Sequence, residues 1–175
     1  RDPVIVETAK NNTLDEAQLV TLPAVLCGAI ERNEDLDFYK FKVEAGQKIC
    51  FHVRSQRLQD KIHDLQKHVD PILFLRNPSG STIASSDNAF FGDPFLCHEF
   101  QQAGEYSLEI RDVRFTGNQY WEYGIEANSR PFVTNVYPLG VTQGEQVSLE
   151  LIGSNLNADQ KTVAWTAPTE TLGVQ

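Results

Sequence analysis

The sequence contains no methionine, not even at its first position, so we expect the 175-residue chain to begin after processing or to be part of a longer protein. It has no apolar run of about 18 residues, the length that a membrane-spanning helix needs, and no positively flanked apolar segment of the signal-peptide kind. We therefore expect no membrane insertion. A secreted, periplasmic or cell-surface location is compatible with these absences.

Basic residues are scarce, because 15 Lys and Arg face 24 Asp and Glu, which gives a formal net charge of -9. Such a chain repels the phosphates of nucleic acids and anionic lipid headgroups. We expect no nucleic-acid partner, and divalent cations or neutral ligands fit this charge better.

Cysteine is scarce too, since only Cys27, Cys50 and Cys97 are present, far apart and in no C-x-x-C pair. This spacing gives no support to metal-finger or thioredoxin chemistry. An odd number of thiols cannot all pair within the chain, so one disulfide plus a free thiol and three buried thiols are both open. We favour three buried thiols, because each cysteine lies in a strand-like apolar run.

Catalytic motifs are missing: there is no G-x-S-x-G nucleophile turn and no H-E-x-x-H zinc motif. His63 and His68 are five residues apart, which on a helix places them off a common face. Cys97 and His98 are neighbours on a predicted strand, so their side chains point to opposite faces. We therefore expect neither zinc nor an enzyme, and we assign His52 and His98 to polar strand faces.

Strand patterns, in contrast, are abundant, because apolar and polar residues alternate over much of the chain. The clearest series runs from Asp70 to Asp112, where turns rich in Pro and Gly separate the apolar runs. Two further runs, 39–43 and 49–53, are joined across Ala45-Gly46 and predict a β-hairpin. The fold class that follows is all-β.

One helix is predicted at about 56–68, where apolar residues recur at helical spacing before Asp70-Pro71 ends the run. The linker Ser129-Arg130-Pro131 predicts a boundary between a domain over 1–128 and a second strand-and-turn unit over 129–175. That second unit is too short for a complete sandwich.

Seven segments of the first domain stand in a characteristic order: Asn11-Asn12-Thr13, Gly28-Ala29-Ile30, Asp35-Leu36-Asp37-Phe38-Tyr39-Lys40-Phe41, Ala45-Gly46-Gln47, Asp70-Pro71-Ile72-Leu73, Gly80 and Ala103-Gly104-Glu105-Tyr106. In this order, over about 5–127, they resemble the bacterial pre-peptidase C-terminal (PPC) domain. That module is attached to many secreted peptidases and is related to collagenase collagen-binding domains. The resemblance implies a jelly-roll-like antiparallel β-sandwich into which the helix at 56–68 is inserted.

The tail carries Pro131, Pro138, Gly144 and Gly153-Ser154-Asn155-Leu156, and this order is similar to the start of an IPT/TIG immunoglobulin-like domain. The similarity implies a partial Ig-like β unit. Modules of this kind space or present other domains.

The PPC resemblance also implies calcium, held between the N-terminal segment and the loop before the D-x-D strand. The matching positions are Glu7, Asn11, Asn12, Asp35 and Asp37. Calcium takes six to eight oxygens, and clustered carboxylates repel one another without a cation. The second carboxylate that the pattern has in the N-terminal segment falls on an alanine here, so a solvated acidic loop is the alternative.

A second acidic loop holds Asp87 and Asp93, a reserve metal site whose alternative is that these residues simply form turns. Between them, Phe90 and Phe91 form either an exposed tip for a partner or a plug at the end of the sandwich. We favour the plug, because burying each ring stabilises the fold by about 1.5 to 3 kcal/mol. Further along, Trp121 and Tyr123 share the apolar face of a strand, which leaves Tyr120 as the exposed ring of that cluster.

The function predicted from these observations is a non-catalytic extracellular accessory module that binds or presents partners. An extracellular protein or polysaccharide would be the partner, and the module would be attached to a larger secreted or surface protein such as a peptidase. The alternative is a structural spacer domain with no ligand.

Overall fold

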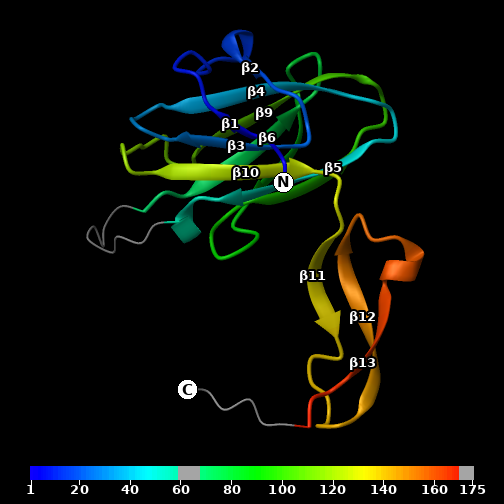
Figure 1. Cartoon of the computed structure of the whole chain (residues 1–175). Helices are drawn as coiled ribbons and strands as arrows, with labels where there is room; N and C mark the ends of the chain where they lie inside the picture. The colour runs from blue at the N-terminus through cyan, green and yellow to red at the C-terminus, as the bar shows by residue number, and fades with distance from the viewer. Residues whose placement is uncertain (59–67, 170–175) are drawn as a thin grey trace. The chain divides into compact units, whose positions relative to one another are not determined.

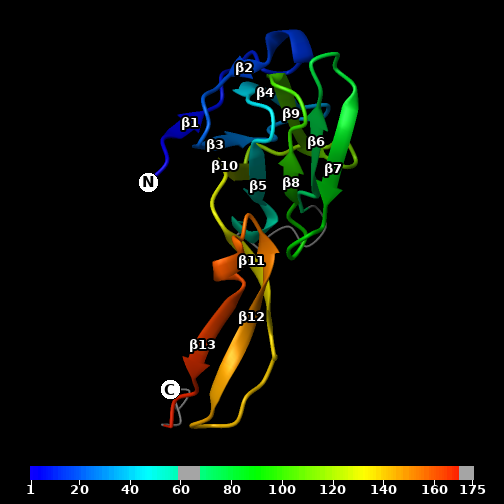
Figure 2. The same cartoon turned by 90° about the vertical axis from the view of Figure 1, so that its right-hand side faces the viewer.

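The computed structural model describes residues 1–58 and 68–169, and the chain divides into two compact units, Arg1–Ser129 and Arg130–Gln175. The first unit is a β-sandwich of two five-stranded sheets, so the predicted all-β sandwich is confirmed (Figures 1 and 2). The first sheet has the order β1-β3-β10-β5-β8 and the second the order β2-β4-β9-β6-β7. These strands are β1 (Val4–Val6), β2 (Gln18–Leu19), β3 (Ala24–Ala29), β4 (Leu36–Val43), β5 (Lys48–Arg54), β6 (Pro71–Arg76), β7 (Thr82–Asp87), β8 (Phe95–Glu99), β9 (Gly104–Asp112) and β10 (Glu122–Asn128).

The chain crosses repeatedly from one sheet to the other, and this makes the expected hairpin wrong. β4 pairs with β9 in the second sheet, whereas β5 pairs with β10 and β8 in the first. The corner between them is closed by Phe100, which accepts a hydrogen bond from Gly46 N (2.7 Å) and donates one to Gln47 O (2.8 Å). The alternation of apolar and polar residues does not distinguish a hairpin from a corner at which the chain passes to the other sheet. In both arrangements the apolar side chains of the two strands face the same core.

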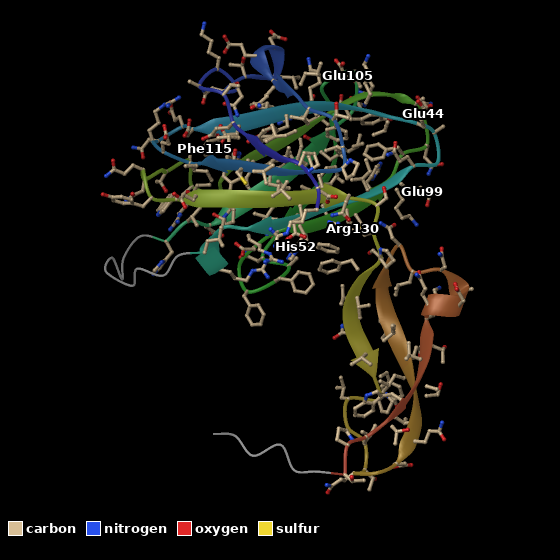
Figure 3. All side chains as sticks on the ribbon, in the orientation of Figure 1. Glu44, His52, Glu99, Glu105, Phe115 and Arg130 are labelled. Carbon is tan, nitrogen blue, oxygen red and sulfur yellow. A yellow bond between two sulfur atoms is a disulfide. The ribbon has the colours of Figure 1, made fainter. Side chains whose placement is uncertain are left out.

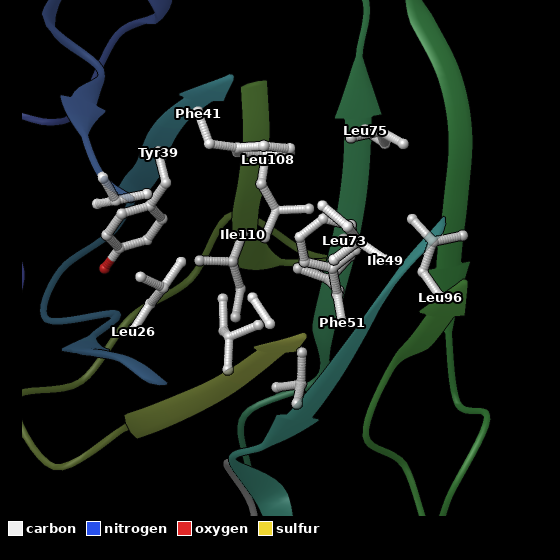
Figure 4. Close-up of a cluster of buried hydrophobic side chains, with 14 of the residues drawn as sticks. Leu26, Tyr39, Phe41, Ile49, Phe51, Leu73, Leu75, Leu96, Leu108 and Ile110 are labelled. Atoms are coloured by element: carbon white, nitrogen blue, oxygen red, sulfur yellow. The ribbon is translucent and has the colours of Figure 1, made fainter. Parts of the chain in front are cut away.

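The core lies between the two sheets and consists of the predicted alternating apolar residues. Phe41 packs against Phe51 and Phe100, with ring centroids 5.6 Å and 6.1 Å apart. Aromatic pairs at such distances stabilise a core beyond the apolar area that they bury. Figure 4 shows Phe41 and Phe51 with aliphatic side chains of both sheets, namely Leu26, Ile49, Leu73, Leu75, Leu96, Leu108 and Ile110.

The N-terminal segment supplies an edge strand to each sheet. β1 pairs in parallel with β3, and β2 pairs in parallel with β4. Between them a 3-10 turn, η1 (Leu14–Glu16), begins after Thr13, whose hydroxyl accepts the Glu16 N–H at 3.3 Å and so caps the turn. The segment that carries Glu7 and Asn11 is thereby fixed along the sandwich.

The cysteine expectation is wrong, because Cys50 and Cys97 form a disulfide and only Cys27 is a free thiol. The two cysteines are direct cross-strand partners in the antiparallel pair β5–β8. Their Cβ atoms therefore face each other at a distance that a disulfide can bridge. The sequence alone does not contain the register of this strand pair, so it left the pairing open.

The predicted helix is described only at its start, where Gln56–Leu58 form a 3-10 turn, η2, and the remainder of the prediction falls on 59–67, outside the described residues. Over the parts of the chain that the structure describes, no helix has both the length and the apolar character needed to span a membrane.

The second unit is a three-stranded antiparallel sheet made of β11 (Phe132–Tyr137), β12 (Gln146–Ser154) and β13 (Thr162–Thr166), with a 3-10 turn, η3 (Ala158–Gln160), before the last strand. Val147 pairs with Trp165 and Leu149 with Val163, so apolar residues line one face of the sheet. Its assignment to the Ig-like domains stays a prediction.

Candidate functional site

Two of the predicted calcium ligands meet at a pair of buried tyrosine hydroxyls, and we call Glu7, Asp37, Tyr39 and Tyr123 the carboxylate cluster. Asp37 lies on β4, on the same face as the core residue Tyr39, and Glu7 follows β1. Tyr123 Oη lies 2.7 Å from Asp37 Oδ2, 3.1 Å from Glu7 Oε2 and 2.7 Å from Tyr39 Oη. The cluster thus joins strands of both sheets to the N-terminal segment.

If all three contacts of the Tyr123 hydroxyl oxygen are hydrogen bonds, one carboxyl group of this cluster carries a proton. Tyr39 and Tyr123 bring one hydroxyl proton each, yet the Tyr123 oxygen has three polar neighbours. If the Tyr39 hydroxyl donates to the Tyr123 oxygen, Tyr123 can donate its own proton to only one of the two carboxylates. The contact between the Tyr123 oxygen and the other carboxyl group is then a hydrogen bond only if that carboxyl group is protonated and donates. Two ionised carboxylates at this point would repel each other in a region with little water.

Asp37 is the group that the surroundings keep protonated. Burial, followed by the negative charge of Glu7, raises the pKa of Asp37 from 3.8 to about 8, although the hydrogen bond from Tyr123 acts in the opposite direction. Burial also raises the pKa of Tyr39 and of Tyr123, so both phenols stay neutral. At neutral pH the cluster therefore holds a proton between its carboxyl groups.

Gly28 on β3 makes room for the cluster. A Cβ atom at this position would lie 2.4 Å from both Glu7 Oε2 and Tyr123 Oη, so any side chain here would displace the groups of the cluster. The other Glu7 oxygen accepts a hydrogen bond from Ala29 N at 2.9 Å, and Glu7 N donates to Cys27 O at 2.8 Å. The end of β1 is thus held to β3 by both the backbone and the side chain of Glu7.

The other three predicted ligands lie in different contacts. Arg32 Nη2 lies 3.2 Å from Asp35 Oδ1 and 3.2 Å from Asn12 Oδ1, so a guanidinium already supplies positive charge there. Asp35 Oδ2 also accepts the Glu31 N–H at 2.7 Å. Asn11 is buried, and its backbone carbonyl accepts the Phe38 N–H at 2.8 Å. The Nδ2 atom of its side chain has no hydrogen-bond partner among the described residues.

Calcium needs a shell of six to eight oxygens, and the described geometry gathers only the two carboxyl groups of Glu7 and Asp37 at one point. Within 1–58 and 68–169, no group of three or more His, Cys, Asp or Glu side chains is placed to hold a metal ion. As arranged, the residues do not offer calcium its shell, and calcium binding stays a prediction from the sequence.

The reserve residues Asp87 and Asp93 differ completely in their surroundings. Asp87 is exposed at the end of β7, whereas Asp93 is fully buried. Asp93 Oδ1 accepts the N–H groups of Ser55 (3.1 Å) and Gln56 (2.7 Å), and its Oδ2 accepts Arg57 Nε at 2.6 Å. Asp93 therefore caps η2 and neutralises Arg57.

Arg57 in turn ties this loop to β5. Its Nη2 donates to Val53 O at 2.7 Å and lies 2.9 Å from His52 Nε2. His52, labelled in Figure 3, alternates along β5 with the core residues Phe51 and Val53 and so lies on the other face of the strand, where it is nevertheless buried. Burial and the neighbouring charge of Arg57 lower the pKa of His52, which keeps the imidazole neutral.

The two phenylalanines before Asp93 have opposite surroundings. Phe90 is half-buried, with its ring centroid 5.9 Å from His52 and 5.5 Å from Phe95, whereas Phe91 is 86% exposed. The plug expectation is therefore wrong for Phe91. Tyr120 is exposed and Trp121 is buried, both as predicted.

Sequence reasoning missed the groups that bind the predicted carboxylates, namely the Tyr123 hydroxyl and the Arg32 and Arg57 guanidiniums. Tyr123 and Glu7 are 116 residues apart, and no local spacing links them. One signal was present, since Asp37 continues the alternating inward series of Tyr39 and Phe41 and so had to be buried with some partner.

No known protein-family profile matches the sequence, and no curated protein matches it. The fold is similar to those of several solved structures, among them the following two. The first is the pre-peptidase C-terminal domain of the collagenase from Bacillus anthracis, with 15% identity, a TM-score of 0.48, and coverage of 64% of this chain and 94% of that one. The second is a periplasmic inhibitor of g-type lysozyme from Aeromonas hydrophila, with 14% identity, a TM-score of 0.41, and coverage of 64% and 99%. The first is a domain of the kind that the sequence resembles.

Proposed function

We propose that the chain is a non-catalytic accessory module that binds or presents partners outside the cytoplasm, as part of a larger secreted or surface protein such as a peptidase. The disulfide between Cys50 and Cys97 supports the location, because such bonds persist in oxidising compartments and are rare in the cytosol.

The observation that carries the proposal is the use of the buried acidic side chains of the first unit. Asp37 joins two sheets and Asp93 caps η2. Asp112 accepts hydrogen bonds from Asp70 N (2.9 Å) and Thr116 Oγ1 (2.8 Å), which fixes the loop after β9. Glu109 is buried between the guanidiniums of Arg76 and Arg111.

Each of these acidic groups is engaged in holding strands or loops in place, so the scaffold uses its buried charges for its own stability. Aromatic side chains, in contrast, are exposed on loops of the same unit, among them Phe91, Phe115 and Tyr120. This division of roles is what a rigid binding module requires.

Sedimentation with insoluble material tests this function. The folded chain is mixed with insoluble collagen, cellulose and chitin, and the chain in pellet and supernatant is quantified, with a heat-unfolded sample as control. We expect saturable binding to at least one material by the folded chain alone. A parallel screen with general peptidase, esterase and glycosidase substrates should show no turnover, and turnover would contradict the proposal.

A structural spacer without a ligand is the second candidate, and the compact unit that follows directly at Arg130–Gln175 favours it. A spacer predicts that every added material leaves the chain in the supernatant. Calcium stabilisation, expected from the sequence, belongs to either candidate and has its own test below.

A further inference from the structure

A two-residue turn in the first unit presents one aromatic ring to solvent, and the inference drawn from it rests on the proposed binding function. We call Phe90–Asp93 the Phe91 turn. Phe90 N donates to Asp93 O and Asp93 N donates to Phe90 O, both at 2.9 Å. The φ angles are +50° at Phe91 and +90° at Gly92, as in a type I′ turn.

Contacts of Phe90, Gly92 and Asp93 with neighbouring residues hold the Phe91 turn in place. Asp93 is bound by η2 and by Arg57, and the Phe90 ring packs edge-on against His52 and Phe95. Gly92 fits closely against Gln56, because a Cβ atom at Gly92 would lie 1.7 Å from Gln56 Oε1. The exposed ring therefore stands on a fixed base.

Phe91 occupies a backbone conformation that suits glycine or asparagine and is unfavourable for a bulky side chain. Phe115 is the informative comparison, because it also has a positive φ (+57°) and is partly exposed (Figure 3). The Phe115 ring, however, stacks on the guanidinium of Arg111, whose Cζ lies 4.0 Å from the ring centroid. Phe91 has no ring or cation contact of this kind among the described residues.

A strained backbone and an exposed apolar ring both work against the stability of the free chain, and strain of this kind gathers at binding sites. We infer that Phe91 is the anchor of a docking surface, inserting into an apolar socket on a protein partner. With its ring free on all sides, Phe91 is suited to fill a pocket, as aromatic anchors at the centre of protein interfaces do.

Other partners fit less well. A single myristoyl chain gives only marginal membrane binding, and one phenyl ring is smaller than such a chain. A sugar offers many hydroxyl groups, and phenylalanine has no polar group to bond them. Because the chain has a formal charge of -9, a partner with positive charge around its socket is favoured.

The experiment uses phage-displayed cyclic peptides selected on the wild-type chain and then measured on two variants. Phe91→Gly removes the ring and suits the positive φ, so its melting temperature should rise by about 2 to 4 °C. Tyr120→Ala is the matched control, because it removes another exposed aromatic ring from a different loop. Vesicles of phosphatidylcholine and soluble chitin and cellulose oligomers are tested in parallel.

We expect most selected peptides to be basic and apolar, to lose at least about tenfold in affinity for Phe91→Gly and to keep their affinity for Tyr120→Ala. Peptides that bind Phe91→Gly as well as wild type overturn the Phe91 anchor and leave the proposed binding function standing. A selection that yields no binding peptide overturns the Phe91 anchor, and it overturns the proposed binding function as well only if the sedimentation assay also finds no bound material. Phe91-dependent binding to vesicles or oligomers overturns the assignment of a protein partner.

Discussion

Asp37 and Asp93 are equally inaccessible to solvent, with 2% and 0% exposure, yet their surroundings are opposite in charge. Asp37 lies beside a second carboxyl group and two phenols, and it holds a proton. Asp93 lies beside a guanidinium and the N–H groups at the start of η2. The same side chain therefore serves as a neutral link between strands in one place and as an anchor for a loop in the other. Burial alone does not reveal which role an acidic residue has; its partners do.

The largest effect is expected from Asp93→Ala. The change leaves Arg57 and the N–H groups of Ser55 and Gln56 without their acceptor, so the free energy of unfolding should fall by about 3 kcal/mol, the lower end for a broken buried ion pair. Urea unfolding followed by tryptophan fluorescence measures it. The exposed Asp87→Ala is the control and should change stability by less than about 0.5 kcal/mol. Equal effects of the two changes would show that Asp93 is not an anchor.

Asp37→Asn should act in the other direction. The folded chain keeps the Asp37 proton up to a pKa of about 8, whereas the unfolded chain releases it near 3.8. Between these pH values the unfolded state binds fewer protons, so the free energy of unfolding of the wild type falls as the pH rises.

Asparagine cannot ionise, so the variant should lose this decline and exceed the stability of the wild type by at least about 1 kcal/mol at a pH near 9. Unfolding curves across this pH range measure the difference. Parallel declines in wild type and variant would assign the pH dependence to other groups.

Tyr123→Phe should cost about 1 to 2 kcal/mol, because it removes the hydroxyl group that Tyr39, Asp37 and Glu7 share while keeping the buried ring. Tyr120→Phe, at an exposed ring, is the matched control. Chemical denaturation at neutral pH compares the two variants, and a stability unchanged in Tyr123→Phe would mean that the cluster does not hold the strands together.

Calcium is expected to have the smallest effect, since it must displace the Asp37 proton before it can bind. Added calcium, compared with chelator, should therefore raise the melting temperature more at a pH near 9 than near 6, and Asp37→Asn should remove the rise. A shift below about 1 °C at both pH values would contradict calcium stabilisation.

Much of the sandwich could be predicted from the sequence, because alternation of apolar and polar residues is a local property. Tyr39, Phe41, Leu108 and Ile110 all face the core as their spacing indicates. The sheet in which each strand lies could not be predicted, since the corner at Gly46 depends on Phe100, more than fifty residues away.

The candidate site was predicted only in part, because it too depends on contacts between residues far apart in the sequence. Glu7 and Asp37 were two of the five residues that the resemblance to the PPC pattern assigned to one site, and the structure brings these two together. Their link through Tyr123, and the pairing of Cys50 with Cys97, depend on strand registers that no local pattern encodes. The strain at Phe91 was likewise hidden, because it arises from the turn type that Gly92 and Asp93 impose together.

The protonation of Asp37 can be measured directly by carbon NMR titration of its carboxyl group in the folded chain. Asp37, buried beside Glu7, should titrate with a pKa of about 8. A pKa near the ordinary value of 3.8 would contradict this account. It would make the cluster an ionised pair of carboxylates, free to hold a cation.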